Sequence, residues 1–101
     1  MKDGLVRVAV ATPHVKVADA VYNAEQTIAL LKKAEQELVS IVVFPELGLT
    51  AYTCADLFLQ STLIDGGIEA LEAVMAASRD LEVVAVVGLP LIWQGKLYNC
   101  A

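Results

Sequence analysis

Residues 42–52 read Val-Val-Phe-Pro-Glu-Leu-Gly-Leu-Thr-Ala-Tyr, and this stretch carries the strongest structural signal in the chain. Its first three residues are apolar, which favours a short buried strand. Pro45 ends the strand because it has no backbone N–H to donate to a ladder. Glu46 then places a carboxylate at the strand end, where a charge is costly unless it is solvated, paired or used in chemistry. Gly48 predicts a tight turn after it.

Working outward, we find short apolar runs that resemble the strand before Pro45. Together they predict four strands, over residues 5–11, 40–44, 83–87 and 97–101. We expect the third strand to end at Gly88 and Pro90, and a turn over residues 94–96 to precede the fourth strand. The last strand is still open where the sequence ends, which suggests a chain truncated at its C-terminal end.

Two helices are predicted between these strands. The first runs over residues 20–38 with Asp19 as its N-cap, and its apolar stripe has helical spacing. That stripe consists of Val21, Ala24, Ile28, Leu31, Ala34 and Leu38. The second helix runs over residues 61–80, with a short helical turn over residues 54–60 before it. Helical crossovers between apolar strands predict an α/β fold with a mostly parallel or mixed sheet.

The composition limits the possible partners of this chain. Its 101 residues are 57% hydrophobic, and the mean hydropathy is +0.63. No apolar run reaches the roughly 20 residues that a membrane span needs, so we expect no membrane partner and attribute the excess to strands covered on both faces. The net charge of −5 and the lack of a basic cluster argue against nucleic acid.

The chain shows no sign of a metal centre or of secretion. Cys54 and Cys100 have no metal-ligand spacing, and His14 is the only histidine, so neither a zinc site nor a disulfide framework is predicted. The first four residues lack the apolar region of a secretory signal. We therefore expect a cytoplasmic protein with reduced thiols.

The turn from Phe44 to Leu47 resembles the Phe-Pro-Glu-Leu turn of the nitrilase, or carbon-nitrogen hydrolase, superfamily. Further motifs in the same order extend the resemblance over nearly the whole chain. They are Val6 to Pro13, Val17 to Asp19, Asn23 to Gln26, Tyr52-Thr53-Cys54, Asp56-Leu57-Phe58, Val87 to Leu91 and Leu97-Tyr98-Asn99. The run over residues 52–58 is most similar to the glutamine-hydrolysing N-terminal domain of glutamine-dependent NAD synthetases.

The resemblance implies an amidase of the Glu-Lys-Cys type. In such an enzyme a cysteine thiolate attacks the side-chain amide of glutamine, a glutamate acts as general base, and a lysine stabilises the oxyanion. Glu46 matches that glutamate, and Tyr52 matches a tyrosine that lines the glutamine pocket. Lys96 precedes the strand that the family's lysine follows, and no residue matches the cysteine. We therefore expect the chain alone to hydrolyse no glutamine.

The resemblance also implies the fold and the parent protein. Residues 1–101 would be the N-terminal portion of a glutaminase domain, a partial α-β-β-α sandwich with about one half of its strands and helices. One sheet face or edge would then stay exposed and favour aggregation. In the parent, the domain would supply ammonia for the ATP-dependent conversion of deamido-NAD to NAD.

We expect no cofactor in this segment, because it lacks a GxxxxGK[ST] phosphate loop, and assign ATP and Mg²⁺ to the parent's missing synthetase domain. Glutamine, that synthetase domain and further copies of the chain in a homo-oligomer are the partners implied. Two alternatives remain open. The parent is another nitrilase-type amidase acting on a small amide, or the chain is a non-catalytic α/β module in which Glu46 caps a helix or pairs with an arginine and Tyr52 only packs.

Overall fold

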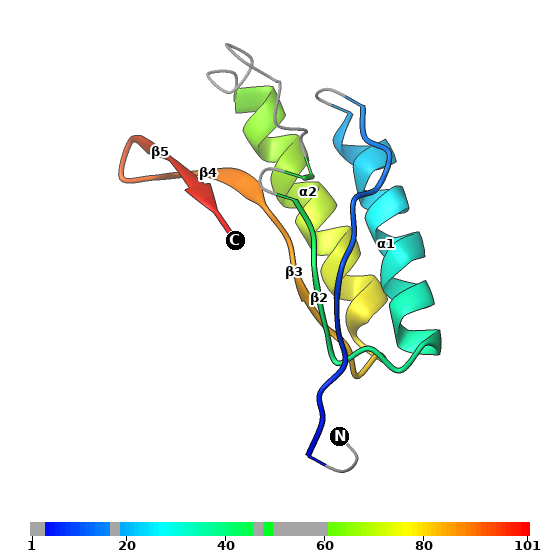
Figure 1. Cartoon of the computed structure of the whole chain (residues 1–101). Helices are drawn as coiled ribbons and strands as arrows, with labels where there is room; N and C mark the ends of the chain where they lie inside the picture. The colour runs from blue at the N-terminus through cyan, green and yellow to red at the C-terminus, as the bar shows by residue number, and fades with distance from the viewer. Residues whose placement is uncertain (1–3, 17–18, 46–47, 50–60) are drawn as a thin grey trace.

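A computed structural model of the chain describes residues 4–16, 19–45, 48–49 and 61–101 (Figure 1). The short helical turn expected over residues 54–60 lies outside these ranges. The described elements are, in chain order, β1 (Val8–Val10), α1 (Ala20–Gln36), β2 (Ile41–Val43), α2 (Ser61–Ser78), β3 (Val84–Val86), β4 (Leu89–Trp93) and β5 (Lys96–Cys100).

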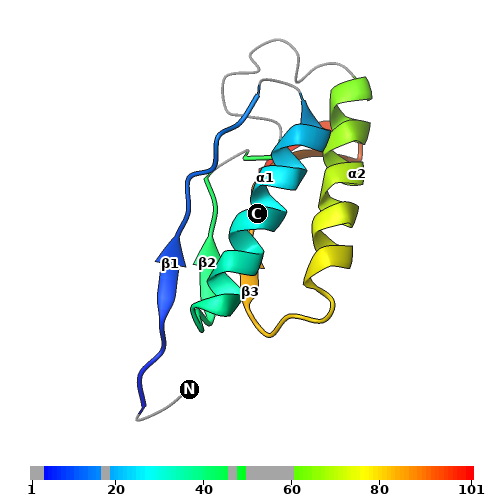
Figure 2. The same ribbon diagram turned by 90° about the vertical axis from the view of Figure 1, so that its right-hand side faces the viewer.

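Strands β1, β2 and β3 form a parallel sheet in that order. Val8 is paired with Ile41, and Ile41 is paired with Val84. Helices α1 and α2 provide the crossovers and lie side by side on one face of this sheet (Figure 2). Successive parallel crossovers of the same hand place both helices on the same side. The predicted α/β fold with a parallel sheet is confirmed.

Within the described residues, the two helices cover one face of the sheet and leave the other exposed, so the expectation of strands covered on both faces is wrong and that of an exposed sheet face is confirmed. Val42 lies in the core beneath the helices, as do Leu31 of α1 and Val74 of α2. On the opposite face, the side chains of Val8, Val10, Ile41, Val43 and Val84 are exposed. In the described part of the chain, neither helix has the length and apolar content needed to cross a membrane.

Helix α1 begins as the sequence predicts and ends earlier. The Asp19 side chain accepts a hydrogen bond from the backbone N–H of Tyr22 at 3.1 Å, which confirms the predicted N-cap. The helix ends at Gln36, because Leu38 adopts a left-handed conformation with φ 60° that no helix can continue. The Leu38 side chain is 80% exposed. Val21 is also exposed, so these two residues do not belong to the buried stripe. The buried stripe contains Ala24, Leu31 and Ala34 as predicted, and also Ala20, Asn23 and Thr27.

The region after β3 differs most from the sequence prediction. The third strand ends before Gly88, as expected, but Pro90 lies in a further strand, β4, which was not predicted and which pairs with β5 as an antiparallel hairpin. Both strands of a two-stranded ribbon are edge strands, and edge strands tolerate proline. Gln94 and Gly95 form the two-residue loop, and both have a positive φ, as in a type I′ turn.

Candidate active site

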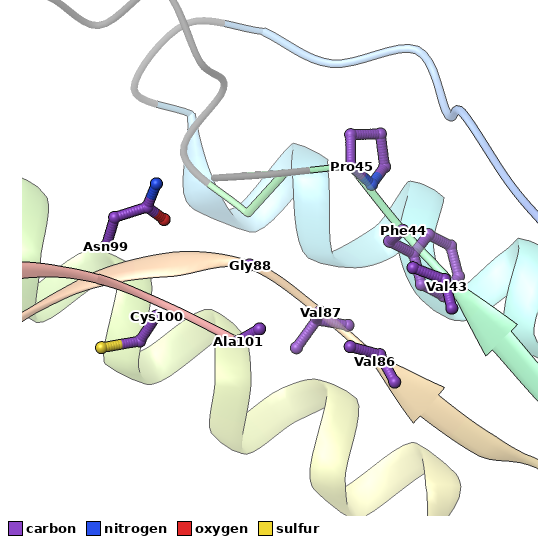
Figure 3. A pocket seen from close by; sticks show the side chains of 9 residues that line it. All are labelled: Val43, Phe44, Pro45, Val86, Val87, Gly88, Asn99, Cys100 and Ala101. Carbon is purple, nitrogen blue, oxygen red and sulfur yellow. The ribbon is translucent and has the colours of Figure 1, made fainter.

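An open pocket lies where the carboxyl ends of β2 and β3 meet the end of β5 (Figure 3). Its volume is about 240 Å³. The lining residues are Val43, Phe44 and Pro45 at the end of β2, Val86, Val87 and Gly88 at the end of β3, and Asn99, Cys100 and Ala101 at the end of β5. Parallel α/β folds build their sites at this edge of the sheet, so this pocket is the candidate active site.

The pocket wall is mostly apolar, with a few polar groups at one side. The side-chain amide of Asn99 and the thiol of Cys100 come from β5, and they extend in different directions in Figure 3 because successive strand residues alternate between faces. Such a surface can hold a small molecule by apolar contacts and orient it with a small number of polar groups.

Backbone hydrogen bonds fix both ends of the turn that follows β2. Before the turn, the Phe44 N–H donates to the Val86 carbonyl at 2.9 Å. After the turn, the Leu49 N–H donates to the Gly88 carbonyl at 3.1 Å, so both ends are tied to the β3 segment. This turn contains Glu46, the candidate general base. Glu46 itself lies outside the described residues, as does Tyr52.

Gly48 allows the turn to close tightly. Its N–H donates to the carbonyl of Pro45 at 3.0 Å, three residues earlier. A Cβ atom at Gly48 would lie 3.0 Å from that same carbonyl oxygen, tighter than nine in ten real Cβ contacts, so the backbone would have to move by a few tenths of an ångström. The tight turn predicted from Gly48 is therefore confirmed, and the reason for glycine is this close approach.

Asn23 joins three segments at the base of the turn, a feature that the sequence analysis did not assign. Its Oδ1 accepts from the Lys16 N–H at 2.7 Å, and its Nδ2 donates to the Lys16 carbonyl at 2.9 Å and to the Leu49 carbonyl at 3.1 Å. The signal in the sequence was an amide on the buried stripe of α1, between the small residues Ala20 and Ala24.

The other residues weighed for chemistry lie in different places. Lys96 begins β5 and pairs with Trp93 at the hairpin turn, at the opposite end of the strand from the pocket. Cys100 is half-buried on the pocket wall, and His14 is exposed. Among the residues that the structure describes, no group of three or more His, Cys, Asp or Glu side chains could hold a metal ion.

The model of the carbon-nitrogen hydrolase family matches residues 7–101. The chain therefore belongs to the carbon-nitrogen hydrolase family, which confirms the resemblance seen in its motifs. This match includes the turn after β2 and every strand around the pocket.

The particular relatives are glutamine-dependent NAD(+) synthetases. The protein of that name from Mycobacterium leprae (strain TN) is 36% identical over 98 residues, which are 97% of this chain and 14% of the relative. The one from Xylella fastidiosa (strain Temecula1 / ATCC 700964) is 36% identical over 97 residues, which are 95% of this chain and 17% of the relative. This chain thus spans about one-seventh to one-sixth of the length of these relatives.

A solved structure shows the same fold. The crystal structure of a glutamine-dependent NAD(+) synthetase from Cytophaga hutchinsonii superposes with a TM-score of 0.87 and 28% identity. The match covers 94% of this chain and 16% of that structure's chain. It confirms the fold class expected from the sequence, an α/β arrangement that corresponds to part of the nitrilase-type domain.

Proposed function

We propose that this chain is the N-terminal part of a glutamine-hydrolysing domain that supplies ammonia for the ATP-dependent conversion of deamido-NAD to NAD. One observation carries the proposal: over nearly its full length, the chain aligns with proteins from mycobacteria, Xylella and Xanthomonas that are all named glutamine-dependent NAD(+) synthetase. That likeness favours this function over an amidase for another small amide and over a non-catalytic module.

In the proposed mechanism, Glu46 acts as the general base of a Glu-Lys-Cys amidase. It takes the proton from a cysteine thiol, and the thiolate attacks the side-chain carbonyl carbon of glutamine. The carbon–nitrogen bond breaks, and ammonia leaves with the proton from Glu46. Water then attacks the thioester and gives its proton to Glu46, which releases glutamate and restores the thiolate.

The cysteine and the lysine of this mechanism are assigned to the parent, beyond residue 101. Ala101 lines the same pocket as Pro45, the residue before Glu46. Residues that continue from β5 would therefore leave the strand beside the turn with the general base, which supports a lysine there for the oxyanion. Because this chain holds the base alone, we propose that it is inactive by itself.

The remaining parts of the proposal concern the parent protein. ATP and Mg²⁺ act in its synthetase domain, and no residue of this chain is assigned to them. The glutaminase domain receives glutamine, lies next to the synthetase domain and assembles into a homo-oligomer. Tyr52 lines the glutamine pocket, and the protein works in the cytoplasm, where ATP is made and thiols stay reduced.

The test is to compare glutamine with ammonium chloride as the nitrogen source for NAD synthesis by the full-length parent. Substitution Glu46→Gln is expected to lower glutamine-dependent synthesis by about 100-fold or more, because a general base contributes roughly 10²–10⁴-fold. Ammonium-dependent synthesis is expected to stay unchanged, since it bypasses the base. Glu25→Gln, on the exposed face of α1, is the matched control. Unchanged glutamine-dependent synthesis in the Glu46 variant contradicts the proposal.

A further inference from the structure

We propose that Asn23 is a positioning residue for the general base, holding the turn that contains Glu46 at its Leu49 end. The inference rests on the proposed function, in which Glu46 activates the nucleophile. Asn23 belongs to α1 and comes 26 residues before Leu49 in the sequence, so this contact is made only in the folded chain.

The chemistry at this position requires a carboxamide. Asn23 is 0% exposed, and its carbonyl oxygen and its amino group are both used. The oxygen accepts one backbone N–H, from Lys16, and the two N–H bonds of the amino group donate to the carbonyls of Lys16 and Leu49. A hydroxyl has one hydrogen to donate, and an ionised carboxylate has none. No other side chain of this size can make all three bonds.

Asn23 completes the attachment of the turn to the rest of the site. Leu49 is buried, its N–H is bonded to Gly88, and its carbonyl is bonded to Asn23. Without the amide, that buried carbonyl would lose the Asn23 donor, and an unpaired buried carbonyl costs about 1–3 kcal/mol unless the backbone moves toward another donor. The backbone that would move is continuous with Glu46, only three residues earlier.

A small movement there is enough to affect catalysis. A general base must come within about 3 Å of the proton that it removes. A misplacement of about 1 Å lowers the rate on the order of 100-fold. The contact from Asn23 should therefore control kcat for glutamine hydrolysis, with less effect on KM, because glutamine binding does not require proton transfer.

The experiment uses the full-length parent with Asn23→Asp and Asn23→Leu. The aspartate variant keeps the acceptor for the Lys16 N–H and loses both donors. The leucine variant has a side chain of similar size and loses all three hydrogen bonds. Both are expected to lower kcat for glutamine hydrolysis per folded molecule by about 10- to 100-fold. KM should change less than about three-fold, and ammonium-dependent synthesis should be retained.

The control separates positioning from loss of stability. Leu31 lies on the same helix and is also 0% exposed, and it faces the core. Leu31→Ala is expected to lower the melting temperature at least as much as the Asn23 variants. Its kcat per folded molecule should equal that of the wild type. If neither Asn23 variant folds, Asn23→Ser, which leaves room for a water beside Lys16 and Leu49, is measured in the same way.

Each result has a distinct meaning. A lower kcat in the Asn23 variants with normal kcat in Leu31→Ala supports the inference. Wild-type kcat in the folded Asn23 variants, or an equal loss in the control, overturns it. If the wild-type parent forms no ammonia from glutamine, the proposed function itself fails, and this is visible before any variant is compared.

Discussion

Single residues on either side of the candidate base attach the backbone after β2 to the rest of the fold. Phe44 before the base donates to the Val86 carbonyl, and Leu49 after it is bonded to Gly88 and to the Asn23 amide. Backbone attachment places a catalytic group more accurately than a long flexible side chain does. We therefore expect a substitution in the segment between these attachments, such as one at Gly48, to change both the stability of the protein and the position of the base.

The first prediction concerns Gly48, where a substitution should move the turn. In Gly48→Ala, the new Cβ would meet the Pro45 carbonyl oxygen at 3.0 Å, and that oxygen belongs to the backbone. We expect a loss of stability of about 1–3 kcal/mol, typical of an overpacked site, together with a lower kcat for glutamine hydrolysis in the parent. Thermal unfolding and steady-state kinetics measure the two effects. A variant with wild-type stability and kcat would show that the turn tolerates a Cβ.

At the scale of secondary-structure elements, two small residues, Ala20 of α1 and Gly66 of α2, face each other where the helices pack. A Cβ atom on Gly66 of α2 would lie 3.7 Å from the Cβ of Ala20 in α1, an ordinary van der Waals distance. Glycine is therefore not required there by space, although it weakens a helix interior. A glycine-to-alanine substitution at Gly66 can therefore be compared with the same substitution at Gly48, where the added Cβ has less space.

The second prediction follows from that difference. Gly66→Ala should raise stability by about 1 kcal/mol, because alanine has the higher helix propensity and restricts the unfolded chain. Thermal unfolding of the parent, compared with Gly48→Ala, tests the opposite signs expected for the two changes. A lower melting temperature for Gly66→Ala would mean that the helices pack more closely here than an added methyl allows.

At the scale of the whole molecule, the sheet has one covered and one exposed face. Helices α1 and α2 cover the face that contains Val42, and the aligned β-branched side chains of the other face meet solvent, with Val10 87% exposed. Stable domains bury both faces of such a sheet against other layers. In the proposed parent, the α-β-β-α sandwich that the family resemblance implies would supply that second layer.

The third prediction is that the 101-residue chain alone self-associates through this face. Sedimentation velocity should show oligomers at micromolar concentration, because an exposed apolar face and a free edge strand both promote association. Replacing Val8 and Val10 of β1 with lysine should shift the distribution toward monomer. Val21→Lys is the control, since Val21 is 69% exposed on α1 and lies away from the sheet. A monodisperse monomer for the unmodified chain contradicts the prediction.

Much of the fold could be predicted from the sequence because its signals are local. The N-cap at Asp19, the two helices and the three strands of the parallel sheet each depend on residues within a short window. The family also follows from ordered motifs. Glu46 and Tyr52 were assigned by that resemblance, and both lie outside the described residues, so their roles stay predictions.

The tertiary structure alone decided the features that depend on distant residues. Pro90 is tolerated in β4 because β4 is an edge strand that pairs only with β5 in the described structure. The local sequence around Pro90 does not predict that pairing. The role of Asn23 depends on its hydrogen bonds to Lys16 and Leu49, which form only when the chain folds. The turn after β2 was visible in the sequence as a carboxylate beside a proline and a glycine. Its attachment to α1 and to β3 was not, since hydrogen bonds between segments far apart in the chain exist only after the chain has folded.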